Sequence, residues 1–378
     1  MKNLTKGYII TKWSEDQGLA VQLSYPENLE VDLDDMMRIF YAHITGAGEA
    51  GNVLVRLEKA HSNVSSYFTG MESEVPYMIN LILELGEEPE LFGETVISQI
   101  NQDILLYLNR LNQYPADNYE TTKGLTNYIK NSLLFLERLK NLTKEQIMAQ
   151  IYTSDKGRTI LNILQQKSLT KKELQSLLEE KTGRFIANLD NSLDPFVKTD
   201  LVRQDWIEGD SDITLFLLSD FIIMRSPVQK LIEDARKGLP TPQLANEYLK
   251  LVTNFFSSYE PTFEDNLKIA THMINPDLFD YIVILREKAY PINKFPKGPG
   301  ESFEQIKEFL NVLEQNKLIA IVKDESNLDW VFLLSDVLAQ QFYPEYLIEN
   351  IRKAVSEKKL KRDTAVKHLE LLEQIYKK

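Results

Sequence analysis

The sequence predicts an α+β fold, with a strand-rich first part followed by a mainly helical second part that contains a duplication. In the first part, short segments of alternating or continuous apolar residues indicate strands, with one helical pattern between them. Helical patterns dominate beyond residue 140, and the pentapeptide FLLSD occurs twice there, at Phe216–Asp220 and Phe332–Asp336.

Length and composition limit the classes of protein. The chain has 378 residues, which favours two or three domains, and it has no cysteine, so disulfides and thiolate metal sites are excluded. No signal peptide and no apolar run of about 20 residues is visible, so we expect a cytoplasmic protein without a membrane span. The formal net charge of -13 disfavours nucleic acid and anionic membranes as partners.

Five strands and three helices are expected within residues 1–140. Strands are predicted at Tyr8–Trp13, Leu19–Tyr25, Val53–Leu57 and Val64–Phe68, and the apolar run VPYMINLILEL predicts a central strand. The first helix has Met37, Phe40, Tyr41 and Ile44 on one face, and two more helices are predicted at Leu91 to about Leu111 and at Leu125–Leu142.

Gly46, Gly48 and Gly51 have the G-x-G-x-x-G spacing of a dinucleotide-binding loop. Such a loop follows a strand and opens a helix, so that the helix N-terminus meets the pyrophosphate. In this chain the predicted order is reversed, because the glycines follow a helix and precede a strand. We therefore interpret them as a helix end and a connection, with Gly supplying the left-handed backbone conformation.

The order strand, strand, helix, three strands, two helices resembles the longin domain, and KWSEDQGLAVQLSYPE is similar to longin-type domains in archaeal proteins. The resemblance implies a five-stranded antiparallel sheet with one helix on one face and two on the other. It also implies a non-catalytic domain that binds small GTPases, trafficking proteins, or other longin and roadblock domains.

The repeat in the second half extends beyond FLLSD, since LIEDARKG from Leu231 matches LIENIRKA from Leu347. Each FLLSD belongs to a predicted hairpin. Three helical segments precede the first hairpin: GRTILNILQQ, TKKELQSLLEEKTG and RFIANLDNSLDPFVK. Three helices and a hairpin make a winged helix-turn-helix. The second copy begins near Asp277, and its middle helix is not recognisable because PINKFPKGPG interrupts it.

The predicted domains are a longin-like domain at 1–140, a first winged-helix unit with following helices at 141–260, and a second with basic C-terminal helices at 261–378. A longin domain before winged-helix units also resembles, in arrangement only, the nitrogen-permease-regulator-like family, which acts on small GTPases. Tandem winged helices are similar to those in membrane-sorting complexes.

DNA-binding winged helices need Lys and Arg on the third helix and on the wing. Both elements carry more Asp and Glu than Lys and Arg in each copy, which favours a protein partner. The alternative, a DNA-binding transcription regulator with a longin-like sensor domain, would use Lys171, Lys172 and Arg184.

No catalytic, cofactor or metal motif is evident, because the four histidines are scattered and neither a P-loop nor a G-x-S-x-G elbow occurs. We therefore expect no enzymatic activity and no cofactor. The candidate partner-binding residues lie on the predicted wings and in the basic C-terminal segment: Trp206, Trp330, Lys358, Lys359, Lys361 and Arg362. The sequence predicts a cytoplasmic adaptor, and its oligomeric state stays open.

Overall fold

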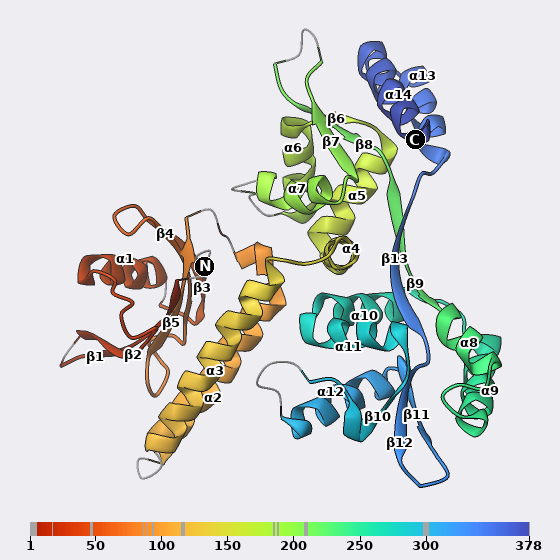
Figure 1. Cartoon of the computed structure of the whole chain (residues 1–378). Coiled ribbons are helices and arrows are strands. Elements are labelled where there is room, and N and C mark those ends of the chain that lie inside the picture. The colour runs from red at the N-terminus through yellow and green to blue at the C-terminus, as the bar shows by residue number, and fades with distance from the viewer. Residues whose placement is uncertain are drawn as a thin grey trace. The chain divides into compact units, whose positions relative to one another are not determined.

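The computed structural model describes residues 6–16, 18–45, 48–85, 87, 89–92, 94–114, 118–183, 186, 189–207, 211–297 and 302–377. The chain divides into two compact units, an N-terminal unit at Met1–Asn141 and a C-terminal unit at Leu142–Lys378. Each unit is described separately below, and Figure 1 gives the labels of the helices and strands.

The N-terminal unit contains a five-stranded antiparallel sheet in the order β2-β1-β5-β4-β3. Its strands are β1 (Gly7–Ser14), β2 (Gly18–Tyr25), β3 (Gly51–Leu57), β4 (Ser62–Phe68) and β5 (Tyr77–Glu84). The predicted central strand is confirmed as β5. Its residues are buried continuously as far as Leu83, because both faces of the sheet are covered, and this explains the unbroken apolar run.

Helices flank the sheet on both faces. Helix α1 (Leu33–Ile44) packs on the face that includes Met78 and Ile82. The short 3-10 helix η1 (Pro89–Phe92) leads to α2 (Glu94–Gln113) and α3 (Asn118–Leu139). Side chains alternate along β5, so Tyr77 points to the opposite face, where its hydroxyl donates to Asn112 of α2 at 3.0 Å.

The buried face of α1 differs from the predicted one by about one residue. Its buried apolar residues are Met36, Ile39 and Phe40, whereas Tyr41 is 54% exposed. Apolar side chains almost encircle this helix, so their spacing alone fits two neighbouring faces. His43 fixes which face of α1 is turned toward the sheet, because its ring is buried and its Nε2 lies 2.8 Å from the Ser66 hydroxyl of β4.

The glycine segment follows a helix and precedes a strand, as predicted. Helix α1 ends at Ile44 with Thr45 as its C-cap, and β3 begins at Gly51. Gly48 is left-handed, with φ +67°, and its carbonyl accepts a hydrogen bond from the Met71 backbone at 3.0 Å. Gly46 lies outside the described residues.

The C-terminal unit contains two repeats with corresponding elements. The first comprises α4 (Lys144–Thr153), α5 (Asp155–Gln166), β6 (Leu169–Thr170), α6 (Lys171–Thr182), α7 (Leu189–Lys198), β7 (Val202–Asp205), β8 (Thr214–Leu217), β9 (Asp220–Ser226), α8 (Gln229–Arg236) and α9 (Pro242–Ser258). The second comprises α10 (Phe263–Ile274), α11 (Pro276–Glu287), β10 (Tyr290–Pro291), η3 (Ile292–Lys294), α12 (Phe303–Gln315), β11 (Ile319–Lys323), β12 (Asp329–Leu333), β13 (Asp336–Phe342), α13 (Tyr346–Ser356) and α14 (Arg362–Tyr376).

Both predicted hairpins are present, as β7–β8 and β11–β12. Where the first repeat has α6, the second has the 3-10 turn η3 followed by residues 298–301, which lie outside the described part of the chain. The first helix of each repeat, α4 or α10, was not predicted, although Thr143 and Gln146 form a capping box at the start of α4.

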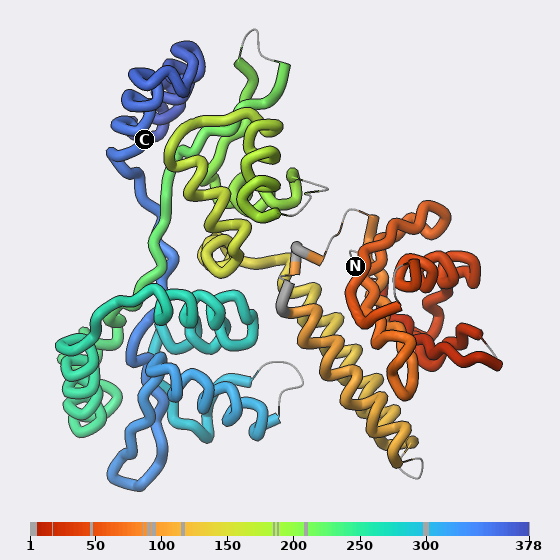
Figure 2. Tube along the Cα trace, turned by 180° about the vertical axis from the view of Figure 1, so that it is seen from behind, coloured from red at the N-terminus to blue at the C-terminus, as the bar shows by residue number. Residues whose placement is uncertain are grey.

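Strands β9 and β13 pair antiparallel with each other and connect the repeats. FLLSD recurs after 116 positions, and Ile223 pairs with Ala339, its own counterpart at that spacing. The two strands therefore cross about a local two-fold axis, as Figures 1 and 2 show.

Each crossing strand carries the helices that follow it to the other repeat. Helix α8 packs on α11, and α9 packs on β11, so both lie against the second repeat. Helix α13 packs on α5 of the first repeat. The prediction that α8 and α9 pack on the first repeat is therefore wrong, because a repeated sequence does not specify which copy a helix covers.

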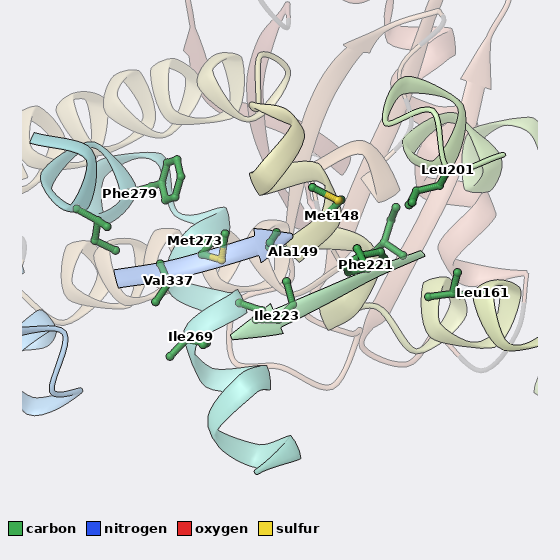
Figure 3. Packing of buried hydrophobic residues seen from close by; sticks show 14 of the residues in the cluster. Met148, Ala149, Leu161, Leu201, Phe221, Ile223, Ile269, Met273, Phe279 and Val337 are labelled. Carbon is green, nitrogen blue, oxygen red and sulfur yellow. The ribbon is translucent and has the colours of Figure 1, made fainter. Parts of the chain in front are cut away.

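The core continues through the crossing. Figure 3 shows Met148 of α4, Ile223 of β9, Met273 of α10 and Val337 of β13 around the paired strands. The side chain of Gln146 donates to the Met273 carbonyl at 3.0 Å, so α4 and α10 are also joined by a buried hydrogen bond. The two repeats thus share one core.

The repeated FLLSD motif contributes hydrogen bonds where the two strands cross. Gln341 of β13 donates to Ser219 at 2.6 Å, and Arg225 of β9 donates to Ser335 at 2.8 Å. Arg225 and Gln341 are again 116 positions apart, so both serines accept from the strand of the other repeat. The motif has the same role in both copies, which gives a structural reason for its repetition.

The helices carried across are anchored in matching ways. His368 of α14 packs its ring on Phe216, and its Nε2 lies 2.7 Å from the Leu217 carbonyl. Tyr248 of α9 stacks on Phe332 and donates its hydroxyl to the Leu333 carbonyl at 3.0 Å. The exchange of helices between the repeats is therefore reciprocal.

Candidate interaction surfaces

The two candidate tryptophans have different environments. Trp206 directly follows β7 and is 58% exposed. Trp330 lies in β12, packs partly buried against the core, and donates its indole N–H to Asp324 at 3.1 Å. Only Trp206 therefore presents most of its indole to solvent.

Asp324 organises the turn between β11 and β12. Its carboxylate accepts hydrogen bonds from the Ser326 hydroxyl, from the backbone of Ser326 and Leu328, and from Trp330. These bonds, led by the one from the Ser326 hydroxyl, lower the pKa of Asp324 to about 2. Trp330 is consequently part of the hairpin's own hydrogen-bond network.

The cations proposed for DNA binding lie beside carboxylates. Lys171 begins α6, and its ammonium is 2.5 Å from Asp190 at the start of α7. Lys172 is exposed, and its backbone N–H donates to Asp212 at 3.0 Å. Arg184 lies outside the described residues. The structure thus places Lys171 and Lys172 near each other at one end of α6, each next to an acidic side chain.

The helices that precede the two hairpins, α7 and α12, carry no excess of basic residues. In α7, Lys198 pairs with Asp194 at 2.6 Å, one turn before it. In α12, the exposed charged residues are Glu304, Lys307, Glu308 and Glu314. The Lys307 ammonium lies 4.7 Å from the centre of the Phe303 ring. Helix α7 carries two Asp and one Lys, and α12 carries three exposed Glu and one exposed Lys, so both helices are acidic.

The candidate basic residues of the C-terminal segment gather where α13 turns into α14. Lys358, Lys359, Lys361 and Arg362 are all exposed there. Lys359 pairs with Glu357 at 2.6 Å, and Lys358 has a left-handed backbone with φ +59°. These four positions form one continuous turn, named here the basic turn.

The structure brings Trp206 to the same helix as the basic turn. Lys367 of α14 pairs with Asp205 at 3.1 Å, and the backbone N–H of Trp206 donates to the same carboxylate at 2.9 Å. Lys367 follows Arg362 by five residues, about 7.5 Å along the helix axis. Trp206 and the basic turn are about 150 residues apart in the sequence, and only the fold makes them neighbours.

The N-terminal unit has a pocket of about 300 Å³ beside edge strand β2. It is lined by Ile9, Val21, Ser24, Leu29, Glu30, Val31 and Met36. Val21 is 59% exposed, and on the opposite edge strand β3, Leu54 is 51% exposed. Among the residues that the structure describes, no further strand pairs with β2 or β3, so both edges carry an apolar side chain next to unpaired backbone groups, as peptide-binding edges do.

Two buried histidines belong to the core. Burial lowers the pKa of His43 to about 4, and it lowers the pKa of His368 to about 4 although the Leu217 carbonyl opposes the shift. His368 Nδ1 also lies 2.8 Å from the Ser168 hydroxyl. Both rings are therefore held neutral and hydrogen-bonded within the fold.

Within the described residues, no group of three or more His, Asp or Glu side chains could hold a metal ion. In that same part of the chain, no helix combines the length and apolar character needed to cross a membrane. Comparisons with protein-family models, with characterised proteins and with solved structures find no match to this chain.

Proposed function

We propose that this chain is a non-catalytic protein-interaction adaptor, in which a longin-like domain precedes two winged-helix units. The sheet order β2-β1-β5-β4-β3, with α1 on one face and a longer helix pair opposite, supports the longin-like part. The helices and the hairpin that follow in the same order in both repeats support the winged-helix part.

One observation carries the choice of a protein partner, namely the charge of the helices at the DNA-facing position. Lys171 and Lys198 are already paired with Asp190 and Asp194. Exposed glutamates outnumber lysine on α12. Phosphate contacts supply most of the affinity of a DNA reader, and each of these carboxylates would repel a phosphate. Protein partners tolerate a surface of mixed or acidic charge.

The non-catalytic part of the proposal rests on the roles of ionisable groups whose pKa values are strongly shifted. Such groups mark active sites when they line a cleft, but structural networks shift pKa values as well. His43 and His368 are bonded inside the two cores, and Asp324 closes a hairpin turn. The fold itself accounts for each of these groups.

The resemblance to longin domains gives the partner classes to examine first: small GTPases, longin-type and roadblock-type proteins, and components of sorting assemblies. The exposed edges of the sheet and the surface around Trp206 are the regions on which we expect such partners to bind. Purification of the full-length chain with its bound proteins, followed by crosslinking of the complex, tests this expectation.

Titration of labelled duplex DNA separates the adaptor from the transcription regulator. At ~150 mM salt we expect only weak binding without sequence preference, contributed by the basic turn. Replacing Lys358, Lys359, Lys361 and Arg362 with Ala should abolish it. A selected sequence that binds ~10³-fold tighter than random duplex would instead establish a specific DNA reader and end the adaptor proposal.

If that preference disappears when Lys171, Lys172 and Arg184 are changed to Ala, the first repeat is the DNA-binding unit. The same three changes should leave binding of the purified protein partner intact if the adaptor proposal holds.

A further inference from the structure

The two connections that follow the crossing strands provide an internal comparison. Helices α8 and α9 are joined by residues 237–241, and α13 and α14 by residues 357–361, so the two connections have equal length. Gly238 and Lys358 are both left-handed, with φ +81° and +59°. Each of these residues donates its N–H to the carbonyl three positions earlier, at 2.9 and 3.0 Å. The two turns share this left-handed residue and its hydrogen bond, although only the first contains a cis peptide bond, at Leu239–Pro240.

Their charges differ sharply. The window 352–363 contains six Lys and Arg residues and two acidic residues. The equivalent window 232–243 contains two basic and two acidic residues. Since the same turn forms without the extra cations at Gly238, the fold does not require them at Lys358.

Lys358 is also a poor choice for its backbone conformation. Glycine adopts a left-handed backbone without steric conflict, whereas a residue with a Cβ is strained there. The sequence repeat aligns Gly238 with Ala354, but α13 ends four residues later than that spacing gives, so Lys358 takes the place of Gly238 in the turn. A position that departs from a local structural rule without a structural gain is a candidate for function.

An apolar stripe continues from the basic turn along α14. Val366, Leu369 and Tyr376 are 47%, 36% and 44% exposed and follow the spacing of one helical face. Tyr343 is 50% exposed and extends the stripe, because its ring lies 6.0 Å from that of Tyr376. The stripe spans about 15 Å of helix, or nearly three helical turns.

Acidic groups on the same helix pair limit the region of positive charge. Glu357 pairs with Lys359, and Glu373, which lies on the stripe face between Leu369 and Tyr376, pairs with Lys377. Asp363 and Glu370 are exposed beside it. The excess of positive charge is thus confined to the end of the stripe that begins at the basic turn.

We infer that the basic turn and the apolar stripe of α14 together form a docking surface for an acidic amphipathic helix of a partner protein. The partner's apolar face would cover Val366, Leu369 and Tyr376, and its carboxylates would meet the basic turn. This inference rests on the proposed adaptor function and specifies the chemistry of one of its partners.

The test is selection of displayed peptides of about 16 residues, roughly four helical turns, on the full-length protein at ~50 mM salt. The expected peptides carry apolar residues at helical spacing, with Asp and Glu on the remaining face. Their affinity, measured by fluorescence anisotropy, should fall about tenfold as salt rises to ~500 mM, because exposed charges are then screened.

Two variants examine the two halves of the surface. Lys358→Gly with Lys359→Ala, Lys361→Thr and Arg362→Ala removes the basic turn and restores the first-repeat residues Gly238 and Thr241 at two positions. Val366→Glu with Leu369→Glu disrupts the stripe. Each should weaken peptide binding by roughly tenfold or more, since several exposed contacts are lost together.

The matched control is Leu251→Glu on α9, a 39% exposed apolar residue of the helix pair whose turn lacks the excess of positive charge. It should leave peptide affinity unchanged, and circular dichroism melts confirm that every variant is folded. The inference fails if selection enriches no acidic helices, or if the selected peptides bind both α14 variants as tightly as the original protein.

Duplex DNA and vesicles containing ~30% anionic lipid are titrated in parallel. Binding of either through the basic turn, at least as tightly as the best peptide, would overturn the inference and assign the surface to that ligand. A protein partner that binds elsewhere would leave the adaptor function standing without this surface, so the two failures are distinguishable.

Discussion

At the scale of single residues, the buried histidines predict how stability depends on pH. The folded-state pKa of His43 and of His368 is about 4, below the usual value of 6.5, so folding favours the neutral ring. This contribution is complete above about pH 6.5 and is lost as pH falls toward 4, at about 1–2 kcal/mol per ring between pH 7 and 5. Urea unfolding at the two pH values measures it.

Substitution identifies the histidine responsible. His368→Gln keeps a side-chain N–H for the Leu217 carbonyl but cannot be protonated, so the pH dependence of the C-terminal unit should shrink. His61→Gln, at an exposed ring, is the control. An unchanged pH dependence in His368→Gln would show that other groups, either carboxylates or His272, whose pKa burial also lowers, control the acid response.

Several of these residue roles were not available from sequence. From the sequence, Trp206 and Trp330 fit an exposed position on a hairpin equally well, because the hydrogen-bond partner of each ring is not visible there. Asp324 and Ser326 form a recognisable turn pattern, but the bond from Trp330 depends on how the hairpin closes. Likewise, His43 had no visible partner until the sheet placed Ser66 opposite α1.

At the scale of elements, the left-handed turns predict that Lys358→Gly alone stabilises the C-terminal unit by about 1 kcal/mol, because glycine relieves the strain of φ +59°. Gly238→Lys on the matching turn should destabilise it by a similar amount. Thermal unfolding of the two variants is the measurement. A loss of stability in Lys358→Gly would mean that the lysine side chain contributes to the fold after all.

Sequence predicted most strands and helices but not the exchange of α8 and α9 with α13 and α14. Local patterns specify a helix and its apolar face, and they act over a few residues. Both repeats present the same acceptor surface, with Phe216 and Leu217 matching Phe332 and Leu333. The path of β9 and β13 determines which repeat the following helices pack on, and that path depends on the whole C-terminal unit.

At the scale of the whole molecule, the shared core predicts that the halves of the C-terminal unit depend on each other. The chain can be divided between Glu260 and Pro261, both exposed and between α9 and α10. We expect residues 142–260 and 261–378 to lack a cooperative melt separately and to form a one-to-one complex when mixed. Light scattering and calorimetry check this, and two stable, non-associating halves would contradict it.

The reciprocal crossing also sets an order of events during protein synthesis. The first repeat is complete only when His368 packs on Phe216 and Leu217. Its hydrophobic surface therefore stays exposed until nearly the last residue of the unit has left the ribosome. Domains otherwise tend to fold from the N-terminus as they emerge. The N-terminal unit can follow that rule, whereas the C-terminal unit can be completed only after α14 has been synthesised, and a chaperone that shields exposed apolar surface would bind its substrate in that interval.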